Sequence, residues 1–182
     1  SDDGRYVAYG IQESGSDWRT WRVRDIETGE DLADELKHLK FTGISWGPGD
    51  KGFFYSKYPD PKPGEEFLST NLDMKVMYHR LGAPQAEDVV VFYDPDHPDW
   101  SYGAGVTDDD RYLIISASVG TDARHRIWYK DLQDPYAAPV PLITEFENDF
   151  SFIGNDGHVF YFFTDDSAPR GRGVAIDTRR PG

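Results

Sequence analysis

The sequence predicts an all-β fold in which four-stranded antiparallel sheets repeat along the chain. A short phrase recurs, an acidic turn followed by aromatic and β-branched residues: SDDGRYVAYG at 1–10, GPGDKGFFYS at 47–56, TDDDRYLIIS at 107–116 and GNDGHVFYFF at 154–163. The four phrases begin 46, 60 and 47 residues apart. Short strands and turns at a period of about 40–50 residues are typical of a β-propeller, whose repeat is a four-stranded blade.

The composition supports a folded domain and argues against some classes of binding partner. The chain has 182 residues, of which 38% are hydrophobic and 15% aromatic, enough to bury a core. Its formal net charge of −14 repels phosphate backbones and anionic lipids, so we expect no nucleic-acid and no membrane partner. The acidic turns are interpreted as solubilising, with an acidic partner-binding face as the alternative. No cysteine is present, which leaves the compartment, cytoplasmic or periplasmic, open.

The first predicted blade covers residues 1–36 and lacks its first strand. Strands are expected at 5–12 (RYVAYGIQ) and 18–26 (WRTWRVRDI), joined by the hairpin turn ESGSD, because both runs are rich in aromatic and β-branched residues. The step Thr28-Gly29 suits a tight reversal after the second of them. A helical turn is expected only around Asp34–Lys40.

The two middle blades are each predicted to hold four strands. The second blade spans 38–94 and contains LKFTGISW, GFFYSKY, KVMYHRL and DVVVFY. Its insert at 59–71 carries three prolines and predicts a mobile surface loop. The third blade spans 99–144 and contains WSYGAGVT, RYLIISAS, RIWYKDL and VPLIT.

The last predicted blade, at 146–182, holds FENDFSFIG, VFYFFTD and GVAIDT and lacks a fourth strand. Two incomplete end blades would expose sheet edges and apolar faces. We therefore expect this chain to be a piece of a larger propeller, able to associate with itself through its open blade edges. A ring of four blades, closed by pairing of the two partial ones, is the alternative.

The residues indicate no catalytic or metal site of their own. The histidines are His38, His79, His97, His125 and His158. None has the spacing of a metal site, and His79 and His125 are expected to be surface or hydrogen-bonded residues. The Asp-rich turns at 2–3 and 108–110 lack the layout of a calcium loop. We expect no serine at a strand-to-helix elbow, and the chain has no phosphate loop, so we predict no catalytic residue, no metal and no cofactor.

Four phrases, taken together and in order, resemble the propeller of the prolyl oligopeptidase family. They are AYGIQESGSDW at 8–18, LKFTGISW at 39–46, Ser69-Thr70-Asn71 followed by Leu72, and RIWYKDL at 126–132. The resemblance covers nearly the whole chain. It implies about four blades of a seven-bladed propeller, residues 1–182, from a serine peptidase that cleaves short peptides after proline.

The resemblance also implies which partners this chain has, and that the chain is inactive on its own. In this family the Ser-Asp-His triad belongs to an α/β-hydrolase domain, which the propeller covers so that only small substrates enter. That domain is not in this chain, which alone is expected to be inactive. The expected partners are the hydrolase domain of the same parent protein and short proline-containing peptides.

Four positions are implied to bind substrate. Asp17 resembles the propeller aspartate that pairs with a substrate-binding arginine of the hydrolase domain, and a bidentate contact would orient that guanidinium. The alternative is an aspartate that only closes its hairpin. Phe41 resembles the aromatic of the outer apolar subsite, placed here at a strand start, with core packing between blades as the alternative.

Two further subsite positions of the family, a methionine and a cysteine, fall on Ser101 and Thr121. Both residues are small and polar, which implies a roomier, less apolar subsite with altered preference at the third residue before the cut. The insert at 59–71 corresponds to a loop implied to act in gating.

A different class of function is also compatible with the fold. A non-enzymatic propeller scaffold would bind a protein partner, and such propellers carry recurrent Trp-Asp strand endings or TolB-like repeats. This sequence has no Trp-Asp dipeptide. Within the peptidases, the neighbouring oligopeptidase B and acylaminoacyl peptidase branches stay as alternatives, although SGSDW and KFTGISW favour the prolyl branch.

Overall fold

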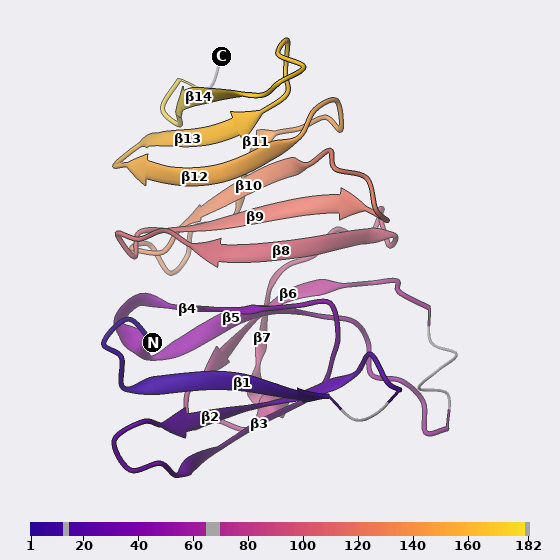
Figure 1. Ribbon diagram of the computed structural model, residues 1–182, viewed down its shortest axis with the longest axis vertical. Helices are drawn as coiled ribbons and strands as arrows, with labels where there is room; N and C mark the ends of the chain where they lie inside the picture. Colours follow the sequence, from indigo (N-terminus) through magenta and orange to yellow (C-terminus); the bar gives the residue numbers. More distant parts are fainter. Residues whose placement is uncertain (13–14, 65–69, 181–182) are drawn as a thin grey trace. The chain divides into compact units, whose positions relative to one another are not determined.

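The part of the chain that the structure describes forms fourteen strands in four antiparallel sheets (Figure 1). The computed structural model describes residues 1–12, 15–64 and 70–180. The sheets have the orders β1-β2-β3, β4-β5-β6-β7, β11-β10-β9-β8 and β12-β13-β14. Three, four, four and three strands thus follow one another as the repeat predicts, and the all-β fold is confirmed.

The strands of the first two sheets alternate with turns at the predicted places. Their bounds are β1 (Tyr6–Gln12), β2 (Arg19–Asp25), β3 (Asp31–Leu39), β4 (Ile44–Trp46), β5 (Gly52–Lys57), β6 (Lys75–Arg80) and β7 (Val89–Phe92). Two 3-10 turns, η1 (Pro48–Asp50) and η2 (Gln85–Glu87), lie between them. The predicted reversal at Thr28-Gly29 is confirmed: Gly29 has φ +74° and its N–H donates to the carbonyl of Asp25 over 2.9 Å.

The other two sheets follow the same plan. Their strands are β8 (Trp100–Val106), β9 (Tyr112–Val119), β10 (Arg126–Asp131), β11 (Val140–Ile143), β12 (Phe150–Asp156), β13 (Val159–Thr164) and β14 (Arg172–Asp177). The chain divides into two compact units, residues 1–104 and 105–182.

Two local predictions are wrong. Residues 34–39 are not a helical turn but the second part of β3, which pairs antiparallel with β2 through two register shifts. The strand predicted at 39–46 is reduced to β4, and Phe41, with φ +55°, lies in the connection between β3 and β4. Parts of the ESGSD turn (13–14) and of the proline-rich insert (65–69) lie outside the described residues.

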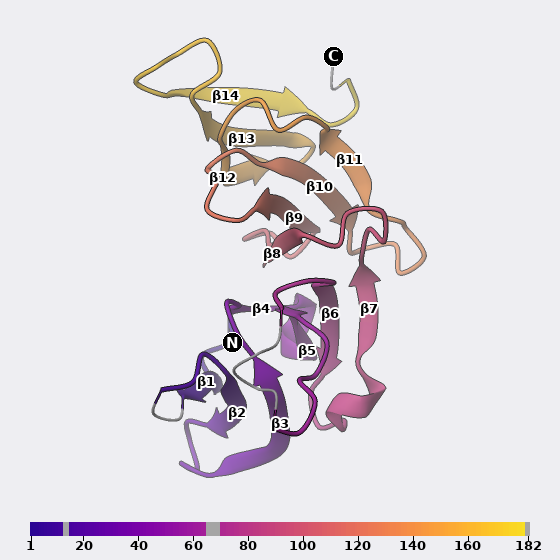
Figure 2. The ribbon, with the colours of Figure 1, turned by 90° about the vertical axis from the view of Figure 1, so that its right-hand side faces the viewer.

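In the first unit the sheets β1-β2-β3 and β4-β5-β6-β7 bury one shared apolar layer (Figure 2). Its fully buried members are Val23, Leu36, Leu39, Phe53 and Tyr55. Burying side chains of this size contributes about 1.5–3 kcal/mol each, so the face shared by two sheets is the main source of stability.

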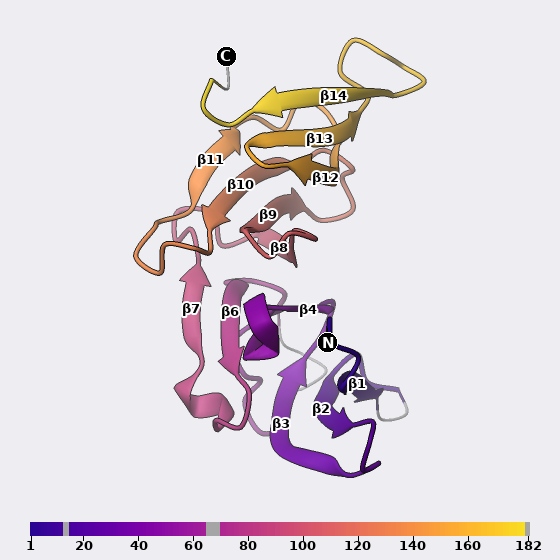
Figure 3. The ribbon, with the colours of Figure 1, turned by 90° about the vertical axis from the view of Figure 1, so that its left-hand side faces the viewer.

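In the second unit β9 and β10 lie beside β12 and β13 (Figure 3). The layer buried there holds more aromatic residues than that of the first unit. Its buried members are Tyr112, Ile114, Ile127, Phe160 and Phe162. Along β13 the burial alternates, so that Tyr161 and Phe163 stay 40% and 48% exposed on the other side. The self-association expected from such a face stays a prediction.

The acidic turns of the repeated phrase connect one repeat to the next. In the first unit the N–H groups of Asp2 and Asp3 donate to the carboxylate of Asp50, over 3.0 and 3.1 Å. In the second unit Asn155 Nδ2 donates to Asp109 Oδ2 over 2.8 Å. These partners are 46–48 residues apart, one repeat period. Some of the acidic turn residues thus hold adjacent sheets together.

Candidate functional site

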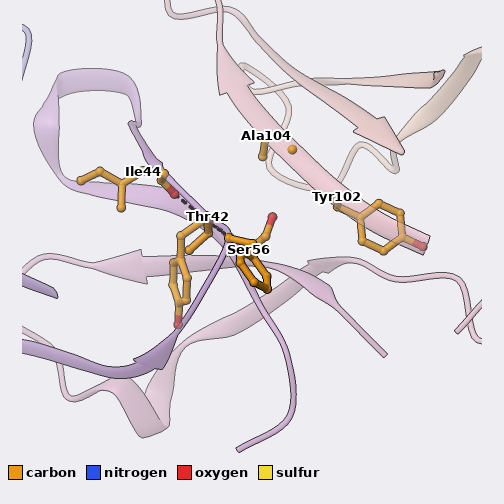
Figure 4. Close-up of a pocket in the computed structure, with 9 residues that line it drawn as sticks. Thr42, Ile44, Ser56, Tyr102 and Ala104 are labelled. Carbon is orange, nitrogen blue, oxygen red and sulfur yellow. Dashed lines mark hydrogen bonds between the residues drawn. The ribbon is translucent and has the colours of Figure 1, made fainter. Parts of the chain in front are cut away.

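A pocket of about 170 Å³ opens in the first unit between the β3–β4 connection and the start of β8 (Figure 4). Thr42, Ile44 and Ser56 line one side, and Tyr102 and Ala104 of β8 line the other. The remaining lining residues are Phe41, Gly43, Tyr55 and Gly103. Backbone, hydroxyl and aromatic groups therefore face one small cavity.

The β3–β4 connection presents Phe41 at the rim of this pocket. Phe41 has φ +55° and is 62% exposed. Thr42 holds the connection against β5, because its Oγ1 accepts the N–H of Ser56 over 2.9 Å. The same hydroxyl donates to the carbonyl of Gly43 over 2.8 Å. The exposure argues against core packing between blades as the role of Phe41, and the side chain is available to a ligand.

Strand β8 forms the opposite wall and is anchored within the first unit. The N–H of Tyr102 points at Met74 Sδ, 3.0 Å away, and its ring meets Phe92 edge-on at 5.3 Å. Burial raises the pKa of Tyr102 to about 12, so its phenol stays neutral at physiological pH. Ser101 is tied to Tyr58 by a hydrogen bond of 3.0 Å between the two hydroxyls.

Lys40, which no sequence pattern marks as a site residue, precedes Phe41 at the rim of this pocket. It is only 6% exposed, and its Nζ lies 4.2 Å from the ring centre of Trp18, 5.4 Å from Tyr58 and 6.0 Å from Phe41. Burial lowers the pKa of Lys40, and the negative charge of Asp17 opposes that shift. A buried cation against three rings is an uncommon and specific arrangement.

Asp17 is exposed in the β1–β2 turn, next to the buried Trp18. The turn is closed by its neighbour: Ser16 Oγ accepts the N–H of Trp18 over 3.1 Å, and the Ser16 carbonyl accepts Gln12 Nε2 over 2.6 Å. Hairpin closure is thus served by Ser16. The carboxylate of Asp17 faces solvent, where it can receive a cationic partner.

The predicted site residues fall into two groups. Asp17, Phe41 and Ser101 belong to the first unit, where Lys40 and Tyr58 connect them through the contacts given above. Thr121 belongs to the second unit, in the turn after β9, and is exposed. The role of all four in binding stays a prediction.

Within residues 1–12, 15–64 and 70–180, no group of three or more His, Asp or Glu side chains is arranged to hold a metal ion. The same residues contain no helix long and apolar enough to cross a membrane. His79 is fully buried and hydrogen-bonded through both ring nitrogens, as expected for it, and His125 Nδ1 lies 3.1 Å from Asp149 Oδ1.

A family profile described as "Prolyl oligopeptidase, N-terminal beta-propeller domain" matches residues 1–182. The chain belongs to this family. It is 39% identical over 178 residues to a prolyl endopeptidase of Elizabethkingia meningoseptica, covering 98% of this chain and 25% of that protein. It is 36% identical over 197 residues to prolyl oligopeptidase A of Galerina marginata, covering 97% and 27%.

Solved structures of the family share the fold. A structure from a study of two prolyl endopeptidases and their inter-domain dynamics superposes with a TM-score of 0.88 at 35% identity, covering 97% of this chain and 25% of that one. Prolyl oligopeptidase B from Galerina marginata, bound to a 35mer hydrolysis and macrocyclization substrate, gives 0.89 at 28% identity, covering 99% and 27%. The chain thus spans about a quarter of the length of the relatives it matches.

Two residues of the candidate site, Lys40 and Tyr58, carry no signal in the sequence. Both stand beside strand-like runs, where a lysine is normally exposed and a tyrosine is normally core. The burial of Lys40 depends on Trp18, which comes from the preceding hairpin. Only the packing of distant segments reveals it.

Proposed function

We propose that this chain is the substrate-admitting propeller part of a serine peptidase that hydrolyses short peptides after proline. The family match carries the proposal. Relatives along the whole chain are named prolyl endopeptidase or prolyl oligopeptidase, and one solved relative holds a peptide substrate. In this proposal the nucleophile, its base and the oxyanion donors lie in an α/β-hydrolase domain of the same parent protein, and this chain alone is inactive.

The role proposed for Asp17 is electrostatic. Its exposed carboxylate receives the guanidinium of an arginine from the hydrolase domain, and that arginine in turn holds a carbonyl of the bound peptide. A bidentate carboxylate–guanidinium pair fixes both the position and the plane of the arginine. The solvent-facing position of Asp17, with its turn closed by Ser16, supports this role.

The role proposed for Phe41 is apolar contact. Its ring, 62% exposed at the rim of the pocket, offers a surface for the side chain of the third residue before the cleaved bond. Ser101 of the first unit and Thr121 of the second are each proposed to contact the substrate, and their small hydroxyl-bearing side chains offer little apolar surface. A subsite of this kind accepts small or polar groups more readily.

The full-length protein provides the test. With a reporter amide blocked as Z-Gly-Pro, we expect release of the reporter, and with the matched Z-Gly-Ala reporter a kcat/KM at least about 100-fold lower, because a proline pocket rejects the open-chain residue. A serine-directed phosphonylating reagent should abolish the activity. Equal rates on both reporters would contradict proline specificity. A full-length protein that folds and binds a protein partner but hydrolyses neither reporter would favour the scaffold alternative.

A further inference from the structure

Lys40 occupies a backbone segment that is held in an unusual conformation. Phe41, which follows Lys40, and His38, near the end of β3, both have φ +55°, in the left-handed region that non-glycine residues rarely adopt. Such conformations persist when the surrounding contacts determine them, and they gather at functional sites. The segment between β3 and β4 is therefore shaped by what its side chains contact.

The strongest of these contacts involve the ammonium group of Lys40. Trp18 approaches it most closely, at 4.2 Å, followed by Tyr58 at 5.4 Å, and both rings are buried. Indole gives the strongest cation–π attraction among side chains, and the attraction grows when the cation is desolvated. Trp18 and Tyr58 thus fix the position of the Lys40 side chain.

Phe41 also contacts the same cation. Its ring centre lies 6.0 Å from Lys40 Nζ, while most of the ring is open to solvent at the pocket rim. An exposed phenylalanine on an irregular segment would otherwise sample several rotamers. The contact with the Lys40 ammonium can restrict this ring without covering it.

We infer that Lys40 is a positioning residue, which holds the ring of Phe41 in the orientation that receives the substrate side chain. The inference rests on the proposed function, because it assigns Lys40 a part in that same subsite. Lys40 itself does not touch the substrate. Lys40 acts on substrate affinity through Phe41, so its substitution changes KM and leaves the chemical step unchanged.

A double-mutant cycle in the full-length protein tests this coupling. We expect Lys40→Met, which keeps the apolar stem and removes the charge, to raise KM for the Z-Gly-Pro reporter about tenfold with kcat within twofold. In a Phe41→Ala background the same substitution should change KM by less than about twofold, because the ring it positions is gone. Lys40→Arg should restore KM to within about threefold of the wild type, since guanidinium also binds aromatic faces.

Lys75 provides a matched control. Its Nζ lies 4.8 Å from the ring centre of Tyr93 in the same unit, so Lys75→Met removes a cation–π contact of the same kind that does not involve Phe41. We expect its KM to stay within twofold of the wild type. If Lys40→Met fails to fold, Trp18→Phe weakens the same contact with little loss of apolar volume and enters the cycle instead.

The outcomes separate the two claims. If Lys40→Met raised KM by the same factor in the wild type and in the Phe41→Ala background, the positioning role would be overturned. A rise in KM for Lys75→Met as large as that for Lys40→Met would overturn it too. In both cases the proposed function would stand. Absence of hydrolysis by the wild-type protein would remove the proposed function, and this inference with it. A coupled rise in KM that Lys40→Arg reverses supports both.

Discussion

His79 and Asp34 come from different sheets of the first unit, 45 residues apart, and are joined by a hydrogen bond of 2.9 Å between Nε2 and Oδ1. Both side chains are fully buried. The other ring nitrogen, Nδ1, lies 2.7 Å from Asp88 Oδ1, and Tyr55 donates its hydroxyl to Asp88 Oδ2 over 2.5 Å. A histidine that faces a carboxylate at each nitrogen can donate twice only as imidazolium.

This cluster predicts a pH dependence of stability. Burial alone would lower the pKa of His79, but the hydrogen bonds that its ring donates to Asp88 and Asp34 outweigh burial and raise the pKa above its ordinary value of 6.5. The cation therefore stabilises the fold fully below pH 6.5, and this contribution is lost as the pH rises through the raised pKa.

His79→Gln should remove that dependence and destabilise the protein. Two carboxylates would stay buried without their cation, at a cost of about 3 kcal/mol. Thermal unfolding of the full-length protein between pH 6 and pH 9 measures both effects. His158→Gln is the control, because the partner of His158 Nδ1 is the neutral hydroxyl of Tyr112, at 3.0 Å. An equal pH slope in wild type and His79→Gln would show that His79 is neutral in the fold.

Gly52, in the second copy of the repeated phrase, is expected to tolerate no side chain. A Cβ there would lie 2.1 Å from the carbonyl oxygen of His79 and 2.6 Å from the hydroxyl of Tyr78. Because backbone would have to move, Gly52→Ala should cost about 3 kcal/mol. Gly105→Ala is the matched control, since nothing lies within 4 Å of its Cβ position. Denaturant melts of the two variants measure the difference, and equal midpoints would contradict the strand packing described for β5 and β6.

Phe41→Ala should separate binding from stability. The ring is 62% exposed, so its removal is expected to change the free energy of unfolding by less than about 0.5 kcal/mol. If the ring contacts substrate, KM for Z-Gly-Pro reporters should rise about tenfold, corresponding to about 1.4 kcal/mol of lost contact. Steady-state kinetics and thermal melts on the same preparation give the two values. A stable variant with unchanged KM would remove Phe41 from the subsite.

The strands of the repeated phrases could be predicted because each carries its own signal. GFFYSK and VFYFFT combine aromatic or β-branched residues with a preceding acidic turn, and they form β5 and β13. Strand β3 has no such signal. Its leucines at 32, 36 and 39 are spaced as on a helix, and its buried residue between them is Asp34, which is paired with His79 from the next sheet.

The candidate site could be predicted only in part, for a similar reason. Asp17 and Phe41 stand in phrases that resemble a family and could therefore be named. Lys40 stands beside Phe41 in the same phrase, but its burial depends on Trp18 from the preceding hairpin and on Tyr58 after β5. A residue whose role arises from packing between segments distant in sequence carries no local pattern.

The most direct test of the account is the effect of Asp17→Asn on kcat/KM in the full-length protein. Asparagine keeps the size of the side chain and removes the charge. We therefore predict that kcat/KM for Z-Gly-Pro reporters falls about 10–100-fold, which corresponds to the loss of one charge-assisted hydrogen bond. Asp2→Asn is the control, because Asp2 is equally exposed but precedes β1, whereas Asp17 follows its end. A fall confined to Asp17→Asn, with unchanged melting temperature, supports a propeller that helps to bind the peptide. An unchanged kcat/KM for Asp17→Asn would contradict it.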